Sequence, residues 1–327
     1  MSSAHNSSAV LAPLTPAAGQ VVGIDVAKEA LDLAFGSRGE LDRIANAIAD
    51  VLTLRDRLLA APPQLVVLEA TGGYEALVAD TLAAAGLPVA VVNPRQVRAF
   101  ARSRGYLEKT DRLDARVLAG FGEANQPMPR PRTDAATREL AGRVTRRHQL
   151  VVMRTAEQQR ARPLPASLAA GVDRHLAWLR QEIATLDREI AALIAAHPQW
   201  AAQDARLRTV PGVGAVVSAT LLGALPELGQ LGPKPLAKLV GVAPLAQDSG
   251  KQRGKRRVGG GRGPVRTVLY LAAVSGARHN PVLRPYYERL RAKGKAPKVA
   301  LTACMHKLLT ILNAMVRDGA SWHPPGA

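Results

Sequence analysis

The chain has 327 residues, and its 44 Lys and Arg against 26 Asp and Glu give a formal net charge of +18. Such a charge attracts polyanions, so nucleic acid is the leading partner. A hydrophobic content of 47% excludes global disorder, and no unbroken apolar run reaches the roughly 20 residues needed to span a bilayer. The single cysteine, Cys304, excludes an internal disulfide and a cysteine-based zinc site, which fits a bacterial-type cytoplasm.

The N-terminal part of the chain predicts an α/β domain over residues 21–125, after a disordered tail over residues 1–20 that is rich in Ala, Ser and Pro. Strands are expected at residues 21–26, 31–35, 41–44, 65–69 and 89–92. Helices are expected over residues 74–85, over the basic stretch after Pro94, and after Thr110 as N-cap.

This order of elements predicts a ribonuclease-H-like sheet. Two or three antiparallel strands come first, and helices then alternate with parallel strands. A Rossmann-like sheet is the alternative. Gly72 and Gly73 lack the third glycine of the dinucleotide-binding motif, which argues against that alternative.

Two carboxylates belong to buried strands of this sheet. Asp25 lies within an apolar strand, where a carboxylate is costly unless a metal or a cation pairs with it. Glu69 ends the next strongly buried strand. These two strands are neighbours in a ribonuclease-H-like sheet, so both carboxylates are expected at the same edge.

Asp111 and Asp114 are three residues apart and therefore share one face of a helix. Four converging carboxylates would repel one another, and Mg²⁺ or Mn²⁺ removes that conflict because both ions favour oxygen ligands. Two such ions could clamp the attacking and leaving oxygens of a phosphodiester. The alternative is that both aspartates are solvated helix charges paired with Arg112 or Arg116.

Residues 137–200 are predicted to form an elongated helical region. Its apolar positions step alternately by three and four residues, which is the pattern of a coiled-coil seam. The seam consists of Leu176, Leu179, Ile183, Leu186, Ile190 and Leu193. We interpret it as a dimerisation region; the alternative is an amphipathic helix that packs on its own core.

Residues 207–320 predict a mainly α-helical C-terminal domain. Residues 210–214 resemble a helix-hairpin-helix turn, in which backbone N–H groups contact a phosphate; a plain helical hairpin is the alternative. A loop rich in Gly, Lys and Arg spans residues 249–263 and contains Ser249, which from the residues alone is at best a hydrogen-bond donor to a phosphate. The predicted nucleic-acid contacts are Arg95, Arg98, Arg102, Lys109, Gly212, Gly214, Lys251, Arg253, Lys255, Arg256 and Arg257.

Six short stretches resemble one family, the DEDD transposases of the insertion-sequence 110 family. In the N-terminal part these are residues 23–28, 68–74 and 109–115. In the C-terminal part they are residues 210–214, 241–244 and 248–250, in the family's order. The resemblance covers essentially everything after the N-terminal tail.

The resemblance implies more than the residues do by themselves. It implies a RuvC-like domain that holds metal through Asp25, Glu69, Asp111 and Asp114, and a serine nucleophile at Ser249 that forms a covalent phosphoserine link to DNA. It also implies guidance by a non-coding bridge RNA that pairs with donor and target DNA. Homodimers would assemble into a tetramer with composite sites, acting on the DNA of a bacterial nucleoid.

Two rival functions remain open at this stage. The first is a Holliday-junction nuclease that uses metal-activated water and leaves Ser249 as a phosphate contact. The second is a basic nucleic-acid-binding protein without catalysis. The four carboxylates argue against the second rival, because a binding protein gains nothing from negative charge concentrated near its DNA.

Overall fold

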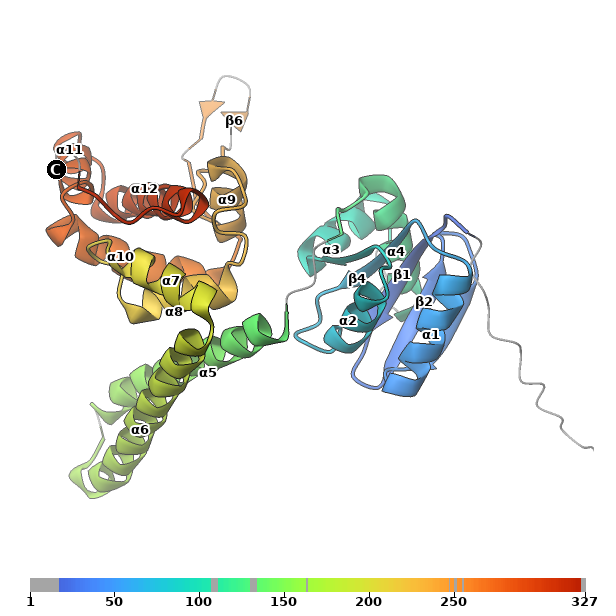
Figure 1. Cartoon of the computed structure of the whole chain (residues 1–327), viewed down its shortest axis with the longest axis horizontal. Helices are drawn as coiled ribbons and strands as arrows, with labels where there is room; N and C mark the ends of the chain where they lie inside the picture. Colours follow the sequence, from blue (N-terminus) through green and yellow to red (C-terminus); the bar gives the residue numbers. More distant parts are fainter. Residues whose placement is uncertain are drawn as a thin grey trace, which may run out of the picture. The chain divides into compact units, whose positions relative to one another are not determined.

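The computed structural model describes residues 18–106, 111–129, 134–162, 164–246, 248–249, 252–254 and 256–324 (Figure 1). For residues 111, 112, 166, 252 and 253 it describes the backbone alone. The chain forms two compact units, Met1–Arg132 and Thr133–Ala327. The predicted tail falls mostly outside the described residues.

The N-terminal unit contains a five-stranded sheet in the order β3-β2-β1-β4-β5. The strands are β1 (Val21–Val26), β2 (Ala30–Phe35), β3 (Leu41–Ala45), β4 (Leu65–Glu69) and β5 (Val89–Val92). The first three pair antiparallel, whereas β4 is parallel to β1 and β5 is parallel to β4. The order and directions of the strands therefore fit the predicted ribonuclease-H-like sheet.

Helices cover both faces of the sheet, so its central strands are apolar on both sides (Figure 1). One face packs on α1 (Ile48–Ala60) and α2 (Ala76–Ala84), and the other on α3 (Pro94–Ser103) and α4 (Asp111–Asn125). In β4, Val66 and Leu68 belong to the first core and Leu65 and Val67 to the second. Alternation along the strand therefore assigns Glu69 to the face of α3 and α4.

Small residues let α4 lie directly on β1. A Cβ atom on Gly23 would come within 2.2 Å of the Ala115 carbonyl oxygen, and one on Gly122 within 2.6 Å of Val21 Cγ1. The C-terminal half of α4 thus lies next to Val21, and the middle of α4 lies next to Gly23. Its first turn therefore comes level with Asp25, two residues further along the strand.

The C-terminal unit is mainly helical. Its helices are α5 (Ala135–Ala161), α6 (Ala166–Ala196), α7 (Pro198–Arg208), α8 (Ala215–Ala224), α9 (Pro233–Val240), α10 (Gly263–His279), α11 (Leu283–Ala292) and α12 (Pro297–Asp318). A small hairpin is formed by β6 (Asp248–Ser249) and β7 (Gln252–Arg253). Helices α7 to α12 share one apolar core, which contains the buried Cys304.

Helices α5 and α6 form an antiparallel hairpin (Figure 1), and the predicted seam packs inside it. Leu179 and Ile183 of α6 pack on Leu150 of α5, and Ile190 joins a second cluster with Leu140. The seam therefore has its partner within the same chain, as the alternative interpretation proposed. Dimerisation through residues 137–200 stays a prediction.

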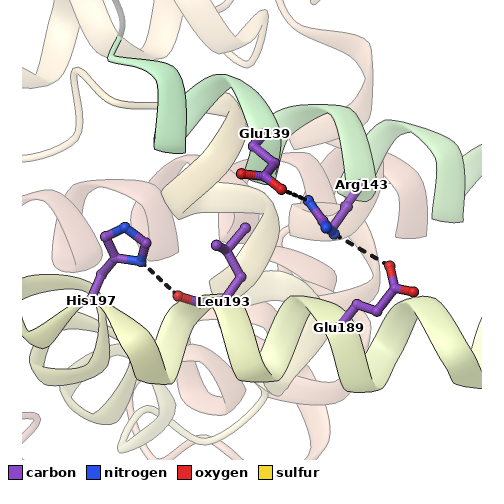
Figure 2. A network of polar contacts seen from close by, with 5 residues as sticks. All are labelled: Glu139, Arg143, Glu189, Leu193 and His197. Carbon is purple, nitrogen blue, oxygen red and sulfur yellow. Dashed lines mark hydrogen bonds and ion pairs between the residues drawn. The ribbon is translucent and has the colours of Figure 1, made fainter.

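Polar contacts hold the same hairpin together (Figure 2). Arg143 of α5 pairs with Glu139 on its own helix and reaches Glu189 of α6, with 3.3 Å between Nε and Oε2. His197 Nδ1 donates to the Leu193 carbonyl oxygen at 2.8 Å, where α6 ends. α5 also packs on α8, so the predicted spacer and C-terminal domain lie in one unit here.

Helix α12 passes a test for membrane-spanning helices by length and composition, with a mean hydropathy of 1.5 over an 18-residue window. It contains no unbroken apolar run of about 20 residues, so it does not contradict the prediction made from the sequence. Ala300, Leu308 and Leu312 of α12 are fully buried in the core of the C-terminal unit. A core helix satisfies the same test, because scattered polar residues do not lower the average enough.

The close approach of α4 to β1 predicts the effect of a single methyl group. Gly23→Ala should destabilise the protein by about 1–3 kcal/mol, because the new Cβ overlaps the α4 backbone. Urea unfolding followed by circular dichroism measures the change. Gly142→Ala is the control: it lies in α5 with no atom near its would-be Cβ, and should stabilise by about 0.5–1 kcal/mol. Equal stabilities of the two variants would contradict the expectation.

Candidate active site

Asp25 and Glu69 come together at the carboxyl ends of β1 and β4. The two strands are parallel, and Ile24 lies opposite Leu68, so the next step of the register sets Asp25 beside Glu69. Asp25 and Glu69 each lie two residues after a position that faces α4, namely Gly23 and Val67, and therefore face the same way. The two carboxylates therefore share one edge and one face of the sheet, and both side chains are only half-buried.

The first turn of α4 completes this corner of the domain. It carries Asp111 and Asp114, whose spacing gives them a common helix face, and it lies level with Asp25. Asp114 is half-buried, whereas the Asp111 side chain is outside the described part of the chain. Carboxylate oxygens are the ligands that Mg²⁺ and Mn²⁺ favour, so the chemistry of this set fits such an ion.

The geometry of a complete metal site is not present among the described side chains. No group of three or more His, Cys, Asp or Glu in that part of the chain lies close enough to hold a metal ion. The described members of the set are Asp25, Glu69 and Asp114. Metal binding by all four carboxylates therefore stays a prediction.

Glu75 orders the loop that follows Glu69. Its Oε2 accepts hydrogen bonds from the backbone N–H groups of Thr71 at 3.1 Å and Gly73 at 2.8 Å, and from the Thr71 hydroxyl at 3.0 Å. Gly72 and Gly73 have φ angles of 79° and 122°, which only glycine adopts without strain. The Gly-Gly pair thus turns the backbone so that its donors converge on one carboxylate.

These contacts change the acidity of Glu75. Burial alone would raise its pKa, but the hydrogen bonds from its own backbone, Gly73 and Thr71 outweigh burial and hold the pKa below the ordinary value of 4.5. Sequence reasoning missed this residue because it considered only the motif's strand-ending acid. A glutamate two residues after a Gly-Gly turn was the available signal.

Asn46 joins the loops that follow the two carboxylate-bearing strands. Its Nδ2 donates to the carbonyl oxygens of Ala27, 3.0 Å away, and Tyr74, 3.2 Å away. The first acceptor follows β1 and the second follows β4. Sequence reasoning also missed Asn46, because it lies just after β3, outside the stretches that resemble the family.

Ser249 lies on the small hairpin of the C-terminal unit. Ser249 pairs with Gln252 across the hairpin, and its side chain is exposed. The preceding Asp248 accepts hydrogen bonds through Oδ1 from Arg256 Nη1 at 2.6 Å and from the Gly254 N–H at 3.1 Å. The hydrogen bond from Arg256 lowers the pKa of Asp248. Part of the predicted loop is thus a closed hairpin.

This pairing gives Arg256 a structural partner that sequence reasoning, which assigned it to phosphate, did not foresee. Arg257 is exposed, and its backbone pairs with Leu245 at the base of the hairpin. Lys251 and Lys255 are outside the described residues, as are Lys109 of the N-terminal unit and the side chain of Arg253.

The other predicted contacts lie on two elements. On α3, Arg95 and Arg102 are exposed and Arg98 is half-buried, with spacings that put all three on one face. Gly214 precedes α8 with open space around it. Gly212 has a φ of 102°, and a Cβ there would lie 2.8 Å from the Ala272 carbonyl oxygen. Close packing on α10 explains this glycine; a phosphate contact stays a prediction.

The depressed pKa of Glu75 predicts a pH-dependent stability difference. The folded protein holds this carboxyl below its unfolded pKa, so the stabilisation is complete above about 4.5 and is lost as the pH falls through the folded value. Glu75→Gln should therefore cost about 1 kcal/mol at pH 7, allowing for solvent screening, and progressively less in acid. Urea unfolding at several pH values measures it.

Glu40→Gln is the matched control, because Glu40 is exposed in the same unit. The free energy of unfolding of Glu40→Gln should equal that of the parent protein at each pH measured. A deficit of Glu75→Gln that stays constant from pH 7 to acid would show that the charge of Glu75 does not stabilise the loop.

Comparison with known proteins places both units in one family. Residues 22–164 match the family model of DEDD transposases of insertion sequence 110, described as Transposase. Residues 204–288 match the model described as Transposase IS116/IS110/IS902 family. The two matches follow the order of the two units along the chain.

Two of the similar proteins match over most of their length and a third over less than half. The pilin gene-inverting proteins of Moraxella lacunata and Moraxella bovis are each 29% identical over 312 residues, which are 91% of this chain and 95% of each relative. The insertion element IS110 uncharacterized 43.6 kDa protein of Streptomyces coelicolor is 32% identical over 147 residues, 44% of this chain and 35% of that protein. The chain belongs to the IS110 family of DEDD transposases, which are DNA-processing enzymes.

Proposed function

We propose that this transposase is an RNA-guided recombinase that exchanges DNA strands through Ser249, with Asp25, Glu69, Asp111 and Asp114 as ligands of Mg²⁺ or Mn²⁺. The observation that carries the proposal is the register of β1 and β4, which sets Asp25 beside Glu69 where α4 begins. Carboxylates gathered at a place where DNA must approach are useful only with a cation between them.

The serine step conserves atoms and protons. The Ser249 oxygen attacks a DNA phosphorus, a serine–phosphorus ester forms, and the bond from phosphorus to the leaving strand's oxygen breaks. The serine gives up its proton, and the leaving oxygen takes one. A hydroxyl of the incoming strand then attacks the phosphoserine by the reverse path and frees Ser249. A divalent ion would stabilise the charge on the reacting oxygens, in place of a general base.

The residues of the chain position these groups. Asn46 and Glu75 fix the loops behind the two strand carboxylates. The Asp248–Arg256 pair closes the hairpin that presents Ser249 to solvent. The carboxylates belong to one unit and the serine to the other, which supports the composite site that the family resemblance implies. We propose that this site forms between subunits of a dimer that assembles into a tetramer.

Guidance by a bridge RNA would explain how the protein selects donor and target DNA. Aromatic residues make up only 3% of the chain, so it has few platforms on which to stack bases. Its +18 charge suits backbone contacts, which carry no sequence information. Base pairing with an RNA would supply that information. Sequencing the RNA that copurifies tests this step, and the absence of a discrete structured RNA would refute it.

The name of the Moraxella relatives supports strand exchange. They are called pilin gene-inverting proteins, and inversion of a gene requires that cut strands be rejoined to new partners. A nuclease that uses activated water would leave hydrolysed ends. Recombination therefore favours the serine mechanism over the Holliday-junction nuclease as the function of this chain.

Ser249→Ala should abolish the covalent protein–DNA adduct and strand exchange, because the attacking oxygen is removed. Denaturing gel electrophoresis with labelled DNA and Mg²⁺ detects the adduct. Ser167→Ala is the control, since Ser167 is exposed at the start of α6. Recombination at the parent rate by Ser249→Ala would exclude the serine mechanism, and metal-dependent cutting without an adduct would favour the nuclease.

Loss of the hairpin's ion pair should slow the serine step. Asp248→Asn keeps the shape of the side chain but weakens the bond to Arg256, so adduct formation should fall by about two- to fivefold, as for an exposed pair. The rate of adduct formation under single-turnover conditions measures it. Asp318→Asn breaks a similar exposed pair, with Arg317, at the end of α12 and should have no effect. Equal rates of both variants would remove the proposed role of Asp248.

A further inference from the structure

A basic cavity of about 630 Å³ lies in the N-terminal unit, apart from the carboxylates. Its walls come from the turn between β2 and β3, from the C-terminal end of α3 and from α4. Three arginines line it, Arg38, Arg104 and Arg116, and the side chains of all three are exposed. Arg38 and Arg116 are not among the predicted nucleic-acid contacts, whereas Arg104 ends the basic stretch that the sequence assigns to a phosphate backbone.

The cavity keeps a positive charge. Glu123 also lines it, but its carboxylate is occupied by Ser37, whose N–H donates to Oε1 at 2.9 Å and whose hydroxyl donates to Oε2 at 2.6 Å. The lining residues thus include three guanidinium groups and one carboxylate, and that carboxylate is already hydrogen-bonded. An anion that entered would gain attraction without displacing an ion pair among the described lining residues.

Neighbouring groups fix two of the arginines in place. Arg104 lies over the ring of Phe100, with 5.5 Å from its guanidinium carbon to the ring centre, and Arg116 Nη2 donates to the Gly39 carbonyl oxygen at 3.4 Å. A stacked guanidinium keeps its edge N–H donors for another acceptor. Little side-chain freedom is then lost when a phosphate binds.

The cavity also offers an aromatic surface and room for one nucleotide. Tyr106 lines the cavity and is 43% exposed. An exposed aromatic side chain is unusual here, because the chain has only 3 Phe and 5 Tyr. Gly120 of α4 forms part of the wall, and a Cβ there would already lie 3.3 Å from Ser37 Cβ. Cations combined with an exposed ring are typical of sites for single-stranded nucleic acid. The volume is within the range of small-ligand sites and is too small for a duplex.

We propose that this cavity binds a phosphodiester and the adjoining base of a single nucleic-acid strand. The three arginines contact the phosphate and Tyr106 stacks on the base. Arg116 follows Asp114 by two residues on α4, which puts the two side chains on different faces of the helix, so the cavity is a site separate from the carboxylate corner. The proposal needs only that the enzyme acts on nucleic acid and does not depend on the serine chemistry.

The salt dependence of binding tests the arginines. Fluorescent 12-residue oligo(dT) and oligo(U) are titrated with the full chain in EDTA, which prevents cleavage. In Arg38→Gln/Arg104→Gln/Arg116→Gln, the slope of log affinity against log salt should become shallower by about 0.7, the value for one lost phosphate contact on a single strand. The triple lysine variant at the same positions should keep most of the slope, which shows that the sites tolerate substitution.

A matched triple variant controls for net charge. Arg55→Gln/Arg284→Gln/Arg317→Gln removes the same charge from arginines paired with acids on their own helices. Its slope should stay close to that of the parent. If the cavity variant and this control lose the same amount with both probes, the cavity is not a binding site and the proposal fails.

Tyr106→Leu tests the base contact separately. It should weaken binding by about tenfold through lost stacking while leaving the salt slope unchanged. Binding at parent affinity would overturn this part of the proposal. A loss confined to oligo(U) would assign the cavity to RNA, a loss confined to oligo(dT) to DNA, and an equal loss to a backbone that both share. Failure of the serine mechanism would appear only in the adduct assay.

Discussion

The close contact between α4 and β1 is the constraint on which the candidate active site depends. Gly23 has no side chain because the backbone of α4 occupies that space, and Gly122 repeats the arrangement at Val21. Once the helix lies this close, its first turn can only come level with Asp25. The positions of the acidic residues are thus set by the packing of Gly23, two residues before Asp25, against Ala115, one residue after Asp114.

The C-terminal unit places its candidate nucleophile in a different manner. Ser249 lies on a short hairpin whose side-chain support is an exposed ion pair, Asp248 with Arg256. Nearby, Arg262 makes a two-pronged contact with Glu227 at the start of α10. The start of α10 is therefore held by a two-pronged ion pair, whereas the hairpin depends on an exposed ion pair that water can replace. A serine that must meet DNA held elsewhere benefits from such an adjustable support.

The sequence predicts the sheet well because each strand carries its own signal. Apolar runs buried on both faces mark the central strands, and the order of the strands predicts which are neighbours, so the placement of Asp25 beside Glu69 follows from the sequence pattern alone. The seam of α6 is also visible in the sequence, but its partner is not. A repeat of three and four residues requires an apolar helix opposite and does not say which chain supplies it.

The residues that escaped prediction act through the backbone. Asn46 binds two carbonyl oxygens, and Glu75 binds N–H groups. Such contacts follow from where loops pass in space, and no periodicity along the chain marks them. Hydrogen bonds to the main chain can therefore be assigned only once the fold is known.

Which arginines contact nucleic acid also cannot be assigned from the sequence. A net charge of +18 indicates a polyanionic partner, yet it does not say which arginines contact that partner. Arg256 lies in the most basic stretch of the sequence and is held by Asp248, whereas Arg104 directly follows α3 and lies over the ring of Phe100. An arginine already bound to a carboxylate must break that bond before it can bind phosphate, and one stacked on a ring does not. Partners in the fold, more than density in the sequence, therefore decide which cations are available to nucleic acid.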